Sequence, residues 1–190
     1  VNVLEAANKL AASIRDLDLR SWLDYEPVSV KVDDREQYQP GYKFNEWELK
    51  GVPVRIEIGP KDLAKGACVL ARRDLPGRES KEMGVPLEGA AKRVGELLKA
   101  MQADLFNRAK TFRDANLHEI DSYDDFKKRI EEPGGFYLAH WDGTRETEDR
   151  IANETKATIR CIPFDRAKEA GKCMVTGQPS AGRVVLAKAY

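Results

Sequence analysis

The stretch KFNEWELKGVPVRIEIGPKDL, residues 43–63, decides the fold of the first half of this chain. Residues 44–49 suit a short helix, which the glycine and proline that follow would end. Residues 54–58 alternate apolar with charged side chains, a pattern typical of a strand buried on one face only. Gly59-Pro60 predicts a turn at the end of this strand. The stretch therefore predicts a helix followed by a half-buried strand.

The same two periodicities continue on both sides of this stretch. Apolar residues at helical spacing predict helices over residues 3–14 and 87–116, and the second is long enough to connect two small domains. Alternation predicts strands over residues 28–32 and 67–71, and Pro76-Gly77 predicts a turn. Together these elements predict the α/β class.

The second half of the chain has its own pattern of strands and helices. Strands are predicted over residues 136–141, 158–164 and 184–189, and helices over residues 123–130 and 146–155. Ser122 is placed to cap the first of these helices. The order indicates a β-α-β unit with a terminal strand. The expected core residues are Phe136, Leu138, Ile159, Ile162, Phe164, Val184 and Leu186.

Composition limits the classes of function. The 190 residues are 42% hydrophobic, enough for a core, and 32 basic residues balance 32 acidic ones. No global field therefore attracts a polyanion, and any contact with RNA has to be local. No apolar run is long enough to span a membrane, and the start lacks the apolar core of a signal peptide. We expect a cytoplasmic protein.

The cysteines and the first residue give two further expectations. Cys68, Cys161 and Cys173 are odd in number and widely spaced, which predicts free thiols rather than a disulfide framework. The chain begins at Val1 and opens directly into an amphipathic helix. We expect it to be a piece of a longer protein.

Several stretches together resemble one family. They are residues 43–63 above, ARRD at 71–74, GGFYLAHWDGT at 134–144, ATIRCIPF at 157–164, GKCMVTG at 171–177 and AKAY at 187–190. The chain resembles prolyl-tRNA synthetases of the archaeal and eukaryal type, over nearly its whole length.

This resemblance implies a domain organisation. Residues 1–85 would form an anticodon-binding domain, a mixed sheet flanked by helices, whose first strand is missing or truncated. Residues 86–121 would form a long connecting helix, and residues 122–190 a small α/β domain related to a zinc-binding domain. In the family the chain end, here Tyr190, reaches back toward the catalytic domain.

The resemblance also implies a function. The parent enzyme would be a class II proline–tRNA ligase that uses ATP and Mg²⁺ and forms a homodimer, and this part would need no cofactor of its own. It would lack the catalytic domain, bind the anticodon of tRNA(Pro), and be a possible monomer. The alternative is a free-standing paralogue that binds tRNA or a protein and has a regulatory role.

The charged side chains after residue 54 are the candidates for reading bases. Proline anticodons share two guanines, whose edges offer N–H donors to a carboxylate and acceptors to Arg or Lys. Five residues supply these partners and are the predicted RNA-binding residues: Arg55, Glu57, Lys61, Asp62 and Arg73. Arg72 is a further candidate for a phosphate or base contact.

Other readings of these segments stay open. The same alternation is typical of an amphipathic strand that exposes its charged side chains to solvent without binding RNA, with Glu57 paired to Arg73 across it. Residues 33–35, Asp-Asp-Arg, would either line the same groove or stabilise a turn. Trp47 could stack on a base, but its neighbours favour a core position.

The family's zinc pattern is largely absent from the second half. Laid on this sequence, the four ligand positions are Asp142, Thr147, Cys173 and Thr176, so only one cysteine is present. Threonine hydroxyls are poor zinc ligands, and we predict no zinc. Cys161 is expected to be buried in its strand. The two histidines, His118 and His140, form no recognisable catalytic set.

Overall fold

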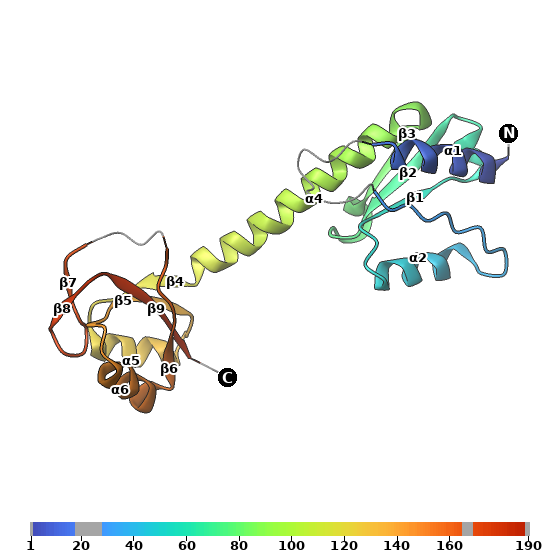
Figure 1. Cartoon of the computed structure of the whole chain (residues 1–190). Helices are drawn as coiled ribbons and strands as arrows, with labels where there is room; N and C mark the ends of the chain where they lie inside the picture. Colours follow the sequence, from blue (N-terminus) through green and yellow to red (C-terminus); the bar gives the residue numbers. More distant parts are fainter. Residues whose placement is uncertain (1, 18–27, 165–168, 189–190) are drawn as a thin grey trace. The chain divides into compact units, whose positions relative to one another are not determined.

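The computed structural model of the chain describes residues 2–17, 28–164 and 169–188. The chain folds as two compact units, Val1–Asn107 and Arg108–Tyr190. Both combine helices with a β-sheet, so the predicted α/β class is confirmed (Figure 1).

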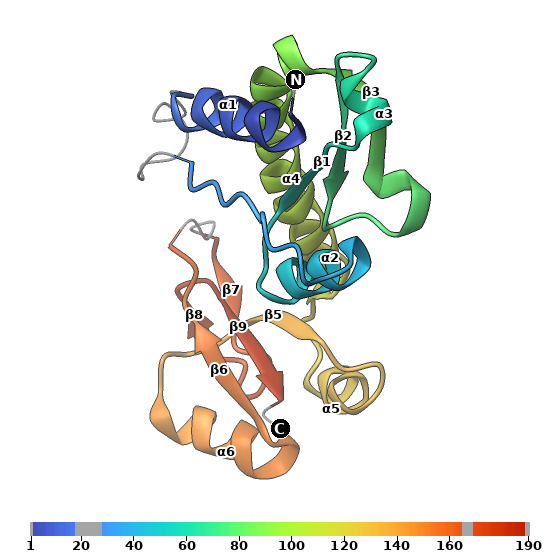
Figure 2. The same ribbon diagram turned by 90° about the vertical axis from the view of Figure 1, so that its right-hand side faces the viewer.

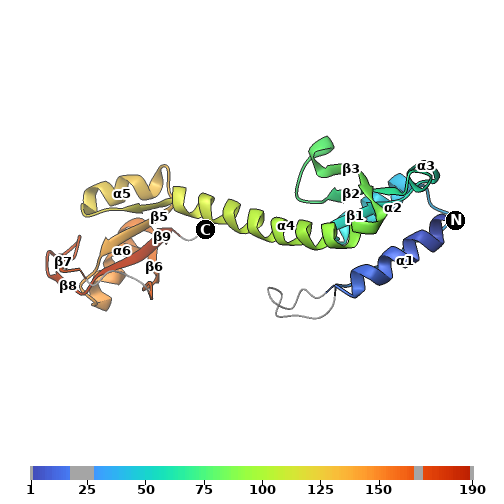
Figure 3. The same ribbon diagram turned by 90° about the horizontal axis from the view of Figure 1, so that it is seen from above.

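The first unit is built on a three-stranded antiparallel sheet in the order β1-β2-β3. Its elements are α1 (Val3–Arg15), α2 (Pro40–Leu49), β1 (Val54–Glu57), α3 (Pro60–Leu63), β2 (Ala67–Arg72), a 3-10 turn (Gly77–Ser80), β3 (Lys81–Pro86) and α4 (Leu87–Ala115). The last helix, α4, is one continuous helix that runs past the end of this unit (Figure 3).

The core of the first unit lies on one face of this sheet. Its buried members come from α1, β2, β3 and the first half of α4: Leu10, Ile14, Cys68, Leu70, Val85, Ala90, Val94 and Leu97. The apolar residues of β1 pack against this cluster, as their alternation predicted. Helices α1 and α4 therefore lie on one face of the sheet (Figure 2). Because Val54 and Ile56 face this core, Arg55 and Glu57, which alternate with them, project from the other face.

The strand predicted over residues 28–32 is wrong. These residues have no strand assignment, although Val28 and Val30 pack against the core as the alternation suggested. The carbonyl of Val30 accepts a hydrogen bond from the Arg15 guanidinium at 2.9 Å instead of joining a ladder. Alternation records which side chains are buried, and it does not record whether a partner strand is present.

The second unit is built on a four-stranded mixed sheet in the order β4-β5-β9-β6. Its elements are β4 (Leu117–Glu119), α5 (Tyr123–Glu131), β5 (Phe136–His140), α6 (Arg145–Thr155), β6 (Ala157–Cys161), β7 (Gly171–Lys172), β8 (Pro179–Ser180) and β9 (Arg183–Lys188). Helices α5 and α6 lie side by side on one face (Figure 1). The Ser122 cap is confirmed, because its hydroxyl accepts from the Asp125 N–H at 3.2 Å.

The predicted core of the second unit is partly wrong. Val184 and Leu186 are buried, and Ile159 packs against the core. However, Phe136, Ile162 and Phe164 are exposed. Strand β5 turns its other face inward, burying Tyr137, whose hydroxyl donates to backbone carbonyls of Arg129 and Gly134 at 2.9 and 3.0 Å. A tyrosine can be buried when its hydroxyl is satisfied.

Two sequence expectations about the whole chain can be compared with this fold. All three cysteines are free, as predicted, but Cys161 is exposed rather than buried. Among the described residues, no helix has the length and apolar character that crossing a bilayer requires. Tyr190 lies outside the described residues.

Candidate nucleic-acid interface

The charged face of β1 carries a tight ion-pair cluster. The Arg55 Nε donates to the Glu57 Oε1 at 3.0 Å, and Lys81 on β3 donates to the same oxygen at 3.0 Å. The side chains of Arg55 and Glu57 are only 16% and 19% exposed. The shared strand face of Arg55 and Glu57 is thus confirmed, whereas the alternative in which Glu57 pairs with Arg73 is wrong.

Helix α2 adds two residues to this cluster that sequence analysis missed. The Phe44 ring lies over the guanidinium of Arg55, 4.2 Å from its central carbon, and Glu48 forms an ion pair with Arg55. Phe44 and Glu48 are four residues apart, and residues at this spacing share a helix face. That spacing is visible in the sequence and was the available signal. We call Phe44, Glu48, Arg55, Glu57 and Lys81 the Arg55 cluster.

The other predicted RNA-binding residues lie at the two ends of β1. Lys61 is exposed on α3, just after the end of β1, and forms no ion pair with any described residue. Asp62 caps the same short helix, where its carboxylate accepts from the Gly59 N–H at 3.1 Å. Arg73 is exposed at the opposite end, and its backbone N–H donates to the Pro53 carbonyl at 2.9 Å. Arg73 therefore lies apart from Lys61 and Asp62.

Arg72 is held by neighbouring carboxylates. Its guanidinium donates to Asp74 at 2.8 Å and to Asp104 of α4 at 2.7 Å. The hydrogen bonds to Asp74 and then Asp104 raise the pKa of Arg72 above its usual range. The side chain is therefore less available to RNA than that of Arg73.

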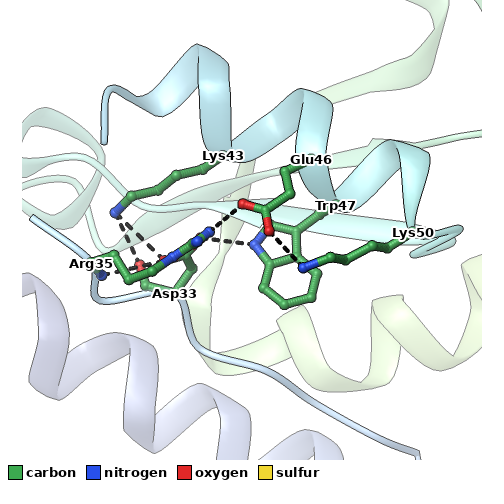
Figure 4. Close-up of polar contacts among 6 residues, drawn as sticks. All are labelled: Asp33, Arg35, Lys43, Glu46, Trp47 and Lys50. Carbon is green, nitrogen blue, oxygen red and sulfur yellow. Dashed lines mark hydrogen bonds and ion pairs between the residues drawn. The ribbon is translucent and has the colours of Figure 1, made fainter. Parts of the chain in front are cut away.

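A second polar cluster is centred on Asp33 and joins the segment before α2 to the helix (Figure 4). The Asp33 carboxylate accepts from Arg35 at 2.7 and 2.9 Å and from the Trp47 indole at 2.8 Å. Arg35 also donates to Glu46 at 2.7 Å, and Lys43 donates to the Asp33 carbonyl at 3.3 Å. Lys50 donates to the other oxygen of Glu46 at 2.6 Å. We call Asp33, Arg35, Lys43, Glu46, Trp47 and Lys50 the Asp33 cluster.

This cluster settles two expectations. Trp47 is half-buried and hydrogen-bonded, not a core residue, so the core prediction is wrong. Asp33 and Arg35 stabilise the local structure rather than opening to a groove. The hydrogen bond from Arg35 holds the pKa of the Asp33 carboxyl well below its usual range, with a smaller contribution from Trp47, although burial opposes this.

Three of the four positions that the resemblance assigns to zinc ligands, Asp142, Thr147 and Thr176, form a third polar cluster with Thr144 in the second unit. The Asp142 carboxylate accepts from the hydroxyls of Thr144, Thr147 and Thr176 at 2.9, 2.9 and 2.8 Å. Burial works to raise the pKa of Asp142, but these hydrogen bonds and the Thr144 N–H outweigh it and lower the pKa to about 2. We call these four residues the Asp142 cluster.

These residues do not fit a structural zinc ion. The Asp142 oxygens are already occupied by hydroxyl donors, and threonine hydroxyls are poor ligands for zinc. Within the described ranges, no three or more His, Cys, Asp or Glu side chains gather as a metal site. Cys173 is buried nearby, and His140 is 3.1 Å from the Ser180 hydroxyl.

Comparison with known proteins assigns the family. A profile described as "Anticodon binding domain" matches residues 1–97, and one described as "Prolyl-tRNA synthetase, C-terminal" matches residues 123–190. The chain belongs to the C-terminal region of the prolyl-tRNA synthetase family. The resemblance stated from its sequence motifs is thereby confirmed.

Individual relatives agree with the two family profiles. The chain is 49% identical over 188 residues to the "Proline–tRNA ligase" of Flavobacterium johnsoniae and 47% identical to that of Christiangramia forsetii. The "Proline–tRNA ligase" of Roseiflexus castenholzii is 45% identical over 188 residues. Each match covers 99% of this chain and 36% of the relative.

The chain thus spans about a third of the length of these curated relatives. The idea of a free-standing regulatory paralogue gains no support, because the relatives carry the ligase name and match this chain end to end. The Arg55 cluster and the Asp33 cluster both lie within the region that matches the anticodon-binding family.

Proposed function

We propose that this chain binds the anticodon of tRNA(Pro) through the Arg55 cluster, as the non-catalytic part of a proline–tRNA ligase. One observation carries the proposal: an aromatic ring, a guanidinium, an ammonium and two carboxylates converge on the face of β1 that points away from the core. Single-stranded RNA bases are bound by stacking on planar groups and by hydrogen bonds to their edges.

The chemistry of the cluster suits a guanine. The N1–H and N2–H groups of guanine need a carboxylate acceptor, and Glu48 is 48% exposed while Glu57 is held in place by two cations. Phe44 and the Arg55 guanidinium offer planar surfaces to stack against. The cluster is largely assembled within the protein, which lowers the ordering cost of binding.

The remaining predicted residues divide into two roles. Lys61 and Arg73 are exposed cations at the two ends of β1, suited to phosphates or to the guanine O6 and N7 acceptors. Asp62 positions Lys61 by capping the short helix α3. We propose that Lys61 extends the base-reading site and that Arg73 contacts the RNA backbone.

The activity of the whole protein follows from its relatives. We infer that the parent is a cytoplasmic class II ligase, a homodimer that attaches proline to tRNA(Pro) using ATP and Mg²⁺. Proline activation would belong to the catalytic domain of that enzyme, with which this chain would associate. The chain by itself would be non-catalytic.

The proposal is tested by binding to proline tRNA transcripts whose two anticodon guanines are kept or replaced by adenine, at one fixed salt concentration. Each lost guanine contact should weaken binding roughly 5- to 150-fold, from about 1–3 kcal/mol per contact. Glu57→Ala and Lys61→Ala should each weaken binding to the unaltered transcript. Lys9→Ala, on the exposed side of α1, is the matched control. Equal affinity for all transcripts would contradict the proposal.

A further inference from the structure

Helix α2 is held in place without a hydrophobic core contact. It spans ten residues and buries none of them, whereas α1, α4, α5 and α6 each bury at least three. Leu49 at its end is 90% exposed. Helices in proteins usually owe their stability to packing of an apolar face, so α2 needs another anchor.

The Asp33 carboxylate supplies that anchor. One oxygen accepts from Arg35 Nε, and the other accepts from Arg35 Nη2 and from the Trp47 indole. The backbone carbonyl of Asp33 accepts from Lys43. Two residues of α2, Lys43 and Trp47, which are about one turn apart, are thus hydrogen-bonded to one residue outside the helix. Figure 4 shows the carboxylate between Arg35 and the indole, with Lys43 reaching it from α2.

Arg35 makes a further link between the two segments. Its guanidinium bridges the Asp33 carboxylate and Glu46 of α2, at 2.7 Å to each. Charge-assisted hydrogen bonds of this kind are about twice as strong as neutral ones and fix direction as well as distance. The side chain of Asp33 is only 13% exposed, so solvent screens these contacts less than it would on an open surface.

The same helix presents Phe44 and Glu48 to Arg55. Trp47 is adjacent in the chain to Glu48, and Lys43 is adjacent to Phe44. Each of the two α2 residues bound by Asp33 therefore neighbours one that contacts the guanidinium of Arg55. A shift of α2 away from Asp33 would move both Phe44 and Glu48.

We propose that Asp33 is a positioning residue for RNA binding: its carboxylate fixes α2 so that Phe44 and Glu48 complete the Arg55 cluster. This inference rests on the proposed function for the RNA step, but the positioning itself is a property of the free protein. Asp33 does not contact the RNA in this account. It acts through the helix.

Asp33→Asn is the variant that tests the idea. It keeps the shape of the side chain but replaces one acceptor oxygen by an NH₂ donor, which would face Arg35 or Trp47 as donor against donor. Asp34→Asn is the matched control, because Asp34 is the exposed neighbour, forms no hydrogen bond or ion pair with the described residues, and loses the same charge. Both variants are made in the full 190-residue chain.

The first readout is the NMR signal of the Arg55 Nε–H, which lies close to the Phe44 ring and senses its ring current. Asp33→Asn should shift this signal and that of the Trp47 indole, and Asp34→Asn should leave both in place. An unchanged Arg55 signal in Asp33→Asn would overturn the positioning role, whatever the RNA result.

The second readout is a double-mutant cycle for binding to the proline tRNA transcript. Asp33→Asn should weaken binding at least tenfold in the native chain but less than twofold in a Phe44→Ala/Glu48→Ala background, because the residues that it positions are then gone. The same loss in both backgrounds would overturn the proposal, since it would mean that Asp33 acts elsewhere. If the Arg55 signal shifts but native binding ignores the anticodon guanines, the proposed function fails and the positioning role stands.

Discussion

The Asp33 cluster and the Asp142 cluster both join separate segments of one unit, but they use different hydrogen-bond donors. Each cluster is centred on an aspartate carboxylate that accepts several hydrogen bonds. The donors at Asp33 are an arginine and an indole, and a lysine lies 3.8 Å away. The hydroxyl donors at Asp142 are neutral threonines.

What each cluster supports also differs. Asp33 holds a helix that buries no residue, so its contacts are the main tie. Asp142 binds Thr147 on α6, a helix that is already fixed by buried Ile151. Asp33 therefore sets the position of a surface helix that can shift without disturbing the core, whereas Asp142 is bonded to a helix that forms part of the core of its unit. This difference predicts that substituting Asp33 loosens α2 alone, whereas substituting Asp142 lowers the unfolding free energy of the whole second unit.

The largest expected effect comes from Asp142→Ala. It removes the acceptor of three hydroxyls, including that of Thr147, which is only 4% exposed. We expect a loss of about 2–3 kcal/mol in the unfolding free energy of the second unit, measured by denaturant-dependent amide exchange in β5 and β9. Asp149→Ala, an exposed aspartate on α6, is the control and should cost less than about 0.5 kcal/mol. Equal losses would remove the special role of Asp142.

Asp33→Asn should act locally. Amide exchange within α2 should accelerate at least tenfold, while global unfolding of the first unit should change by less than about 1 kcal/mol, because α2 adds no side chain to the core. A large global loss would show that the two clusters do not differ in the way described.

Acidification offers a smaller effect with a defined sign. The folded-state pKa of Asp142 is about 2, below the ordinary 3.8, so folding favours the ionised form. The stabilisation from this shift is present above about pH 4 and is lost as the pH falls toward 2. The difference in unfolding free energy between the native chain and Asp142→Asn should be constant from pH 7 to 5 and shrink below pH 4. A difference that shrinks near pH 6 would point to another group.

Chelation should have no effect on the native chain. The Asp142 cluster uses hydroxyl donors where the family pattern has thiolates, so EDTA should leave the thermal midpoint unchanged. Replacing Asp142, Thr147 and Thr176 by cysteine would give a four-thiolate set with Cys173 and should create zinc binding. Stoichiometric zinc in the native protein, measured by elemental analysis, would contradict the reading of this cluster.

The sequence predicted the elements of this fold better than the contacts between them. The strand at β1 and the helix α4 were found because their periodicity reflects burial on one face. Strand β3 was missed, because KEMGVP has little alternation and is mostly exposed. In β5, Phe136 looks more apolar than Tyr137, yet Tyr137 is inside because its hydroxyl finds two carbonyls.

In the candidate site, too, local relations were predicted from the sequence and contacts between separate elements were not. Arg55 and Glu57 were placed correctly on one face of the strand, because the spacing of two residues in a strand is a local relation, but their mutual hydrogen bond was not predicted. The contributions of Glu48 and Lys81 depend on how α2 and β3 meet β1, which no local pattern contains. For Asp33 the sequence left two roles open, lining an RNA-binding groove or stabilising a turn. They could not be separated, because its partners Arg35 and Trp47 come together only in the fold.

The most direct test compares Asp33→Asn and Asp142→Asn in one assay, binding to the unaltered proline tRNA transcript at fixed salt. If the Asp33 cluster serves RNA binding and the Asp142 cluster serves stability, Asp33→Asn should bind at least tenfold more weakly and Asp142→Asn within twofold of the native chain. Equal losses in the two variants, or a loss only in Asp142→Asn, would contradict the account.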